Sequence, residues 1–120
     1  MTAPNIVNVS TITAKTVGAA LGTTLTTALL TNPTSSGKVF KINTIIACNV
    51  DGSSSADVSL EHYDGTNSRR IASTISIPAD STLVALDKNS IIYLEEGHSI
   101  RGGASATGDI ECLISYEEIS

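Results

Sequence analysis

The chain has 120 residues, enough for one domain with a hydrophobic core of its own. Aromatic residues make up only 3% and Trp is absent, so the core has to be built from Ile, Val, Leu and Ala. A net charge of −5, with only seven Lys and Arg, excludes the cationic stripe that nucleic acids and anionic membranes require, so we expect neither as a partner.

The start of the chain and its two cysteines indicate where it folds. Residues 1–8 have neither the positive start nor the apolar run of a signal peptide, and threonines and glycines interrupt the apolar stretch 17–30. No run approaches the ~20 apolar residues of a membrane span. We therefore expect folding in a cytoplasm. Cys48 and Cys112 fall on the apolar parity of their strands, which favours buried free thiols over a disulfide or a zinc site.

Residues 1–21 are predicted to be extended, with apolar and polar side chains on both parities. Such a segment has no committed buried face. It is either an edge strand or an arm that completes its pairing on a neighbouring subunit, and we favour the arm. The candidate assembly residues in this segment are Ile6, Val7, Val9 and Ile12.

Residues 22–120 are predicted to form a single β domain, because alternating apolar residues recur between turn clusters such as Asp64-Gly65 and Pro78-Ala79-Asp80-Ser81. The predicted strands are 23–31, 38–50, 56–63, 70–77, 82–86, 91–94, a short Gly/Ala/Ser strand and 110–119. Within residues 17–30 a brief helical turn is the alternative.

Eight or nine strands with frequent turns are typical of an antiparallel β-sandwich or jelly roll, which is the fold we expect. Alternate side chains of strand 38–50 point to opposite faces of the sheet. Asn43 and Asn49 are therefore expected on the face away from the core. The side chains predicted to fill the core are Phe40, Ile42, Ile46, Val58, Leu60, Ile75, Leu83, Leu94, Ile110, Cys112 and Ile114.

Polar residues gather at two places that a chemical site could use. Residues 61–64 (Glu-His-Tyr-Asp) include metal-ligand types, but neighbours on a strand point to opposite faces, so a polar strand end is the better interpretation. His98 follows Glu95-Glu96-Gly97, where it could pair with a glutamate and titrate near neutral pH. The alternative is a solvated turn.

Catalysis has little support in the sequence. No serine lies in a nucleophile-elbow frame, and no glycine loop that could hold a phosphate precedes a helix. A glycosidase pair could draw on Glu61, Asp64, Glu95 or Glu96, but the stacking aromatics of sugar-binding sites are scarce. We therefore predict a protein that is not an enzyme and has no catalytic residues, cofactor or metal.

Three stretches of the sequence resemble a group of small β-rich virion proteins of tailed bacteriophages. They are SSGKVFKINTIIACNVDG (36–52), IASTISIPADSTLVALDKNSIIYLEEGHSI (71–100) and the closing ISYEEIS (114–120). The resemblance covers most of residues 36–120, whereas the N-terminal third matches loosely. His98 stands where an aspartate is usual in that group.

The resemblance implies a structural component of the virion, assembled in the cytoplasm of the bacterial host. A capsid decoration (cement) protein on the head lattice is the favoured role. The alternative is a neck, tail or fibre component, possibly a glycan-binding module for host recognition. Expected partners are phage capsid or tail proteins and copies of the chain itself, as a homo-oligomer for which a trimer is favoured.

Overall fold

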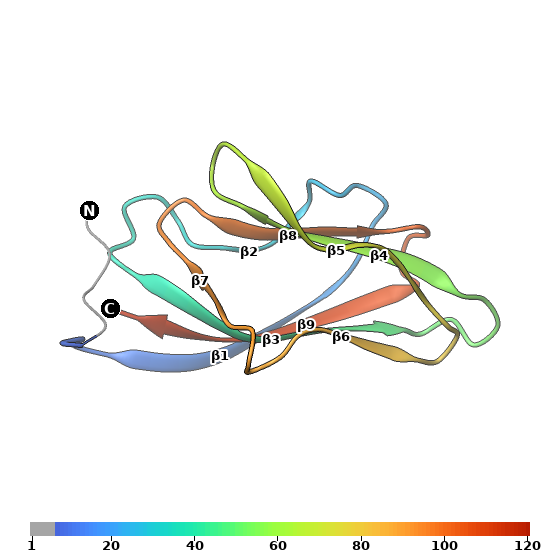
Figure 1. Ribbon diagram of the computed structural model, residues 1–120, viewed down its shortest axis with the longest axis horizontal. Helices are drawn as coiled ribbons and strands as arrows, with labels where there is room; N and C mark the ends of the chain where they lie inside the picture. Colours follow the sequence, from blue (N-terminus) through green and yellow to red (C-terminus); the bar gives the residue numbers. More distant parts are fainter. Residues whose placement is uncertain (1–6) are drawn as a thin grey trace.

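The computed structural model describes residues 7–120 and shows a sandwich of two antiparallel sheets, with nine strands and no helix in that range (Figure 1). The strands are β1 (Ile12–Ala20), β2 (Ala28–Thr31), β3 (Val39–Asn49), β4 (Ala56–Tyr63), β5 (Ser68–Ile77), β6 (Thr82–Leu86), β7 (Ile92–Leu94), β8 (Ser99–Ala104) and β9 (Ile110–Ile119). The all-β sandwich prediction is confirmed.

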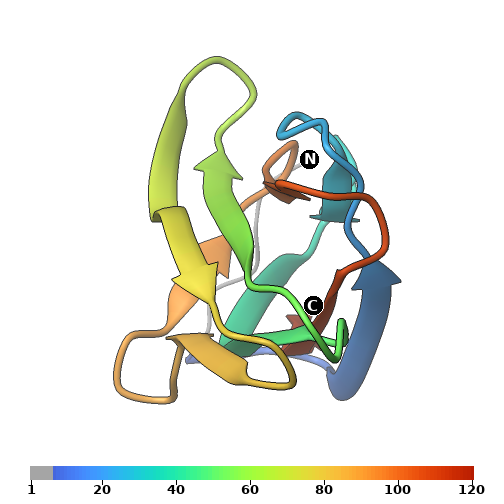
Figure 2. The same cartoon turned by 90° about the vertical axis from the view of Figure 1, so that its right-hand side faces the viewer.

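Each sheet combines strands that are distant in sequence. Sheet A has the order β1-β9-β3-β6, with β7 also paired to β3, and sheet B has the order β2-β8-β4-β5. The chain crosses from sheet B to sheet A between β5 and β6, at the side of the molecule opposite β1 (Figure 2). β1 and β6 therefore lie on opposite sides of sheet A.

Turn residues end the strands where the sequence predicted. At the β4–β5 hairpin, the Asp64 carboxylate accepts hydrogen bonds from the backbone N–H groups of Thr66 and Asn67, at 2.9 and 2.6 Å. Gly65, which follows Asp64 in this turn, has a φ of 92°, a conformation that glycine adopts without strain. The element shortened most is β2, which begins at Ala28 instead of residue 23, whereas β3 is one residue shorter than predicted at each end and β7 one residue shorter at its start. Residues 17–30 contain no helix, but the Thr27 N–H donates to the Thr24 carbonyl at 3.2 Å and closes a turn there.

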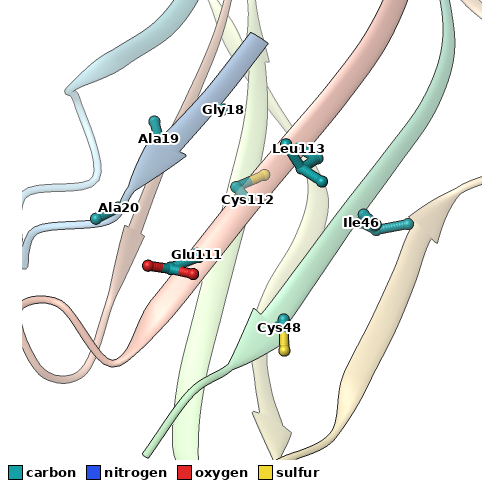
Figure 3. A pocket seen from close by; sticks show the side chains of 8 residues that line it. All are labelled: Gly18, Ala19, Ala20, Ile46, Cys48, Glu111, Cys112 and Leu113. Atoms are coloured by element: carbon teal, nitrogen blue, oxygen red, sulfur yellow. The ribbon is translucent and has the colours of Figure 1, made fainter. Parts of the chain in front are cut away.

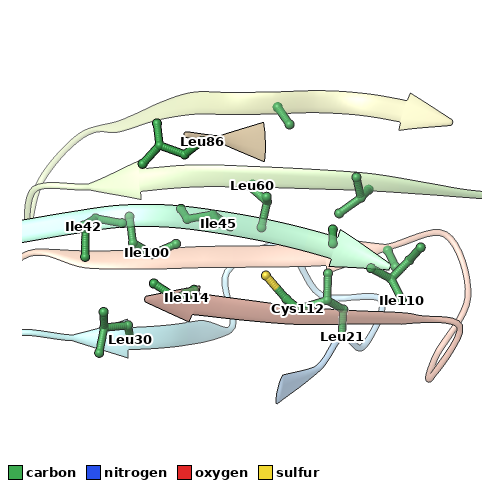
Figure 4. Packing of buried hydrophobic residues seen from close by; sticks show 14 of the residues in the cluster. Leu21, Leu30, Ile42, Ile45, Leu60, Leu86, Ile100, Ile110, Cys112 and Ile114 are labelled. Atoms are coloured by element: carbon green, nitrogen blue, oxygen red, sulfur yellow. The ribbon is translucent and has the colours of Figure 1, made fainter. Parts of the chain in front are cut away.

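The core lies between the two sheets and is mainly aliphatic (Figure 4). Because inward and outward side chains alternate along a strand, one parity of each strand supplies it. The predicted core residues that are buried are Phe40, Ile42, Val58, Leu60, Leu94, Ile110, Cys112 and Ile114. Tyr116 joins them, with its ring centroid 5.2 Å from that of Phe40.

A bulge in β3 corrects three predictions. Ile42 pairs with Tyr116 and Thr44 with Ser115, so Asn43 is an extra residue that shifts the inward parity. Beyond it Ile45, Ala47 and Asn49 are buried, whereas Ile46 and Cys48 are only half-buried on the other parity. Ile46 is therefore not a core residue, the free thiol of Cys48 is not buried, and Asn49 does not face away from the core.

Two further core predictions are corrected by position in the sheets. Ile75 is 39% exposed, because it lies on the edge strand β5, although it is opposite the buried Val58. Leu83 packs against the core but is half-buried, since β6 is short and lies at the rim of sheet A.

Two buried asparagines anchor loops to the sandwich. The Asn32 amide donates to the carbonyls of Lys38 and Leu94, at 2.9 and 3.0 Å. The Asn49 amide donates to those of Ser54 and Ile77, both at 2.9 Å. Each satisfied amide offsets its own burial and fixes the end of a strand.

Candidate assembly surface

β1 forms an open edge of sheet A. Within residues 7–120 its one strand partner is β9, in an unbroken register from Ile12–Ile119 to Ala20–Glu111. Thr11 and Ser120 exchange backbone hydrogen bonds at 3.0 Å, and Leu21 donates to Ile110 at 2.8 Å. In an antiparallel ladder, hydrogen-bonded residue pairs alternate with pairs that are not hydrogen-bonded. The backbone groups of the odd-numbered β1 residues therefore bond to β9. The residues whose N–H and C=O groups point to the open edge are Ile12, Ala14, Thr16, Gly18 and Ala20.

The N-terminal assembly residues predicted from sequence lie at the start of this edge. Ile6 is outside the described residues. Val7 is 90% exposed, Val9 is half-buried, and Ile12 is 58% exposed opposite Ile119. The described part of the segment thus presents the exposed apolar side chains of Val7 and Ile12. Its role in assembly remains a prediction.

The outer face of sheet A carries an apolar row that crosses all four strands. Gly18 pairs with Leu113, Leu113 with Ile46, and Ile46 with Val84. Leu113 is 47% and Val84 58% exposed. Figure 3 shows Leu113 between Gly18 of β1 and Ile46 of β3.

A hollow of about 390 Å³ opens at the β1 side of this row (Figure 3). Small side chains on β1 create it, and its lining residues are Gly18, Ala19, Ala20, Ile46, Cys48, Glu111, Cys112 and Leu113. A Cβ atom on Gly18 would lie 3.0 Å from Cδ2 of Leu113, so Leu113 leans over the glycine. The face therefore has a depression on one side and the exposed Val84 on the other.

Charged groups tie β1 to its own sandwich near the chain ends. Lys15 Nζ lies 2.8 Å and Lys38 Nζ 3.0 Å from the two carboxylate oxygens of Glu118. The hydrogen bond from Lys15 is the main cause that lowers the pKa of Glu118, and the same bond raises the pKa of Lys15. This link holds the side chain of Lys15 back over β9, so it does not block the open edge.

The Glu61 carboxylate, one of the sequence candidates for chemistry, is occupied. On sheet B it accepts hydrogen bonds from Nε of Arg101, at 2.8 Å, and from an Arg101 terminal nitrogen, while Arg70 Nε lies 3.8 Å away. The Arg101 guanidinium also donates to Ser68 at 2.7 Å and lies over the Tyr63 ring, 4.0 Å from its centroid. A buried carboxylate held in this way joins β4, β5 and β8.

The two histidines form a pair that the sequence did not indicate. Nδ1 of His98 lies 3.2 Å from Nε2 of His62, and the rings meet edge to face. Burial lowers the pKa of His62, and the charge of His98 lowers it further. His98 thus pairs with a histidine and not with a glutamate, and it links β4 to the turn before β8.

The remaining carboxylate candidates do not gather at one site, and Oε1 of Glu96 is buried without a hydrogen-bond partner among residues 7–120. Asp64 caps its hairpin, and backbone hydrogen bonds from Asn67 and Thr66 lower its pKa. Within the described range, no three His, Cys, Asp or Glu residues gather where a metal ion could be held. In residues 7–120 there is also no helix long and apolar enough to cross a membrane. The four residues 61–64 do not converge on one site.

Comparisons with known proteins give a partial likeness to solved structures. No family model matches the chain, and no curated protein does. A solved structure of a pentameric capsid protein from metagenomic phage sequences is 15% identical with a TM-score of 0.43. The alignment covers 87% of this chain and 62% of that one, so this chain spans less than two thirds of its length. A likeness of this size assigns neither a function nor an assembly state.

Proposed function

We propose that this chain is a non-enzymatic structural protein of a tailed-phage virion, a decoration (cement) protein that binds the head lattice as a homo-oligomer. The observation that carries the proposal is the open edge of β1. Five residues there present backbone donors and acceptors that no strand of residues 7–120 pairs with. The sequence resemblance of residues 36–120 to small virion proteins supports the same role.

An edge strand of this kind suits strand addition. A neighbouring strand would satisfy the backbone groups of Ala14, Thr16 and Gly18 without a large flat interface. Natural proteins usually protect such an edge with charge, proline or a covering loop. β1 contains no proline, and its one charged side chain, Lys15, is bound to Glu118. Apolar Val7 and Ile12 extend the contact at the start of the edge.

A trimer is the oligomer we favour. An edge that binds a different surface of the next copy makes a head-to-tail contact, and three such contacts form a closed ring when the rotation between neighbouring copies is a third of a full turn. Residues 1–21 would then act as the arm that links subunits, with residues 22–120 as the body.

The test of virion location is the copy number in purified particles of the phage that encodes the chain. Quantitative mass spectrometry is expected to find hundreds of copies per particle, as a head lattice requires. A few copies at the tail tip, together with glycan binding by the purified protein, would contradict the decoration role and support a fibre module instead.

The test of the edge is a proline at a position whose N–H points outward. Ala14→Pro removes an outward donor but no hydrogen bond to β9, so the subunit is expected to stay folded and lose binding to particles. Ala14→Val keeps the donor at the same position and is the matched control, which should bind. Equal binding by both variants would refute strand addition at β1.

A further inference from the structure

We infer that the outer face of sheet A binds the same face of a second copy, related by a two-fold axis that runs parallel to the strands between β9 and β3. This contact goes beyond the proposed virion role, because it joins two chains before either binds a lattice. Four features of the face support it: its pairing pattern, its shape, its charges and its size.

The pairing pattern follows from the symmetry. An axis between β9 and β3 places each of these strands over the other in the second copy. Two outward residues that lie opposite each other on β9 and β3 of one chain therefore also meet across the interface, one from each chain. Leu113 of one copy meets Ile46 of the other, Ser115 meets Thr44, and Glu111 meets Cys48. In the first two of these pairs an apolar group faces an apolar group and a hydroxyl faces a hydroxyl.

The shape is complementary for the same reason. The axis also exchanges the two sides of the sheet, so β1 of one copy lies over β6 of the other. Gly18, which lines the hollow and is partly covered by Leu113, then lies opposite Val84, the most exposed side chain of the apolar row. The hollow next to Gly18 leaves room for that side chain, twice per dimer.

The charges agree with this arrangement. Lys41 and Glu117 are opposite in register on the outer face, yet neither takes part in an ion pair of residues 7–120. Across the axis, Lys41 of each copy meets Glu117 of the other. The two opposite-charge pairs therefore lie side by side near one end of the strands, on one side of the apolar row.

The size of the face approaches what a stable dimer needs. Four strands about 4.8 Å apart, with the lengths of β1, β9, β3 and β6, cover roughly 500 Å² in projection. Side-chain relief increases this area, and stable interfaces bury roughly 800 Å² per partner. Faces of two sheets pack about 10 Å apart in this way. Such an apolar face on a chain with a net charge of −5 is the part of its surface best suited to a second copy.

The experiment measures the mass of the purified full chain in solution, by light scattering or sedimentation. The expected species contains an even number of chains: two, or six if the β1 edge also links three. Val84→Glu is expected to halve that mass, because it places a carboxylate against Gly18 of the partner. Ser73→Glu adds the same charge on β5 of sheet B and should leave the mass unchanged.

A charge exchange tests the axis itself. Lys41→Glu should shift the species toward half mass, and the double variant Lys41→Glu, Glu117→Lys should restore it, with circular dichroism verifying the fold of each. A wild-type species of one or three chains would overturn the inference. A mass unchanged by Val84→Glu, or a double variant that fails to reassociate, would also overturn it.

Discussion

The outer faces of the two sheets differ in how their side chains are satisfied. On sheet B, Arg101 and Glu61 bond to each other across β4 and β8, and Arg101 also engages Ser68 and Tyr63. On sheet A, the row from Gly18 to Val84 is apolar and partly exposed. One face is completed within the chain, whereas the other has groups suited to a partner. Two sheets of one small sandwich can therefore divide stability and assembly between them.

The largest expected effect separates the two faces of β3. Ile45→Ala should cost about 3 kcal/mol of unfolding free energy, because Ile45 is fully buried among the core residues. Ile46→Ala should cost less than about 1 kcal/mol in the same urea titration, since Ile46 lies beyond the bulge on the outer face. Equal losses of unfolding free energy for Ile45→Ala and Ile46→Ala would show that β3 has no bulge at Asn43.

A somewhat smaller effect is expected on sheet B. Arg101→Ala should lower the unfolding free energy by about 2 kcal/mol, because it leaves the buried Glu61 carboxylate with only the more distant Arg70. The value lies below that of a fully buried pair, as the Arg101 side chain is partly exposed. Arg69→Ala removes a surface arginine and is the control, expected within about 0.5 kcal/mol of the wild type. A similar loss for both would mean that the Glu61 ion pair contributes nothing specific.

The smallest effect concerns pH. The pKa of His62 is lowered below 6.5, so the folded state favours its neutral ring more than the unfolded state does. The stability that this provides is complete above pH 6.5 and is lost as the pH falls through the lowered pKa. Asp64 and Glu95 oppose the shift, and the His62 side chain is only half-buried, so the change is modest.

His62→Gln removes this titration. Melting temperatures measured from pH 7.5 to pH 5 should fall less steeply for the variant than for the wild type. Parallel curves would show that the His62–His98 pair does not couple to folding.

The strand boundaries could be predicted because turn chemistry is local. The hairpin aspartate Asp64 and the Pro78–Ser81 turn mark strand ends in sequence as they do in the structure. Period-2 alternation then located most of the core. β4, β6 and β9 have the bounds expected from the sequence.

The errors arose where a single extra residue changed the parity of a strand. The bulge at Asn43 leaves no mark in the apolar pattern, because Ile45 and Ile46 are adjacent and either parity reads as apolar. The exposed row through Leu113 and Val84 could have been found from the outward parity of 110–119 and 82–86. The Glu61–Arg101 pair could not, since its partners are 40 residues apart and only the pairing of β4 with β8 brings them together.

The most direct test of the central claim is hydrogen exchange of β1 in the free subunit and in the assembled particle. In the free subunit roughly half of the amides of residues 12–20 should exchange rapidly, because the even-numbered N–H groups point to the open edge. In the particle these amides should become protected while those of the β4–β5 hairpin stay unchanged. Rapid exchange of the even-numbered amides in both states would contradict assembly through the β1 edge.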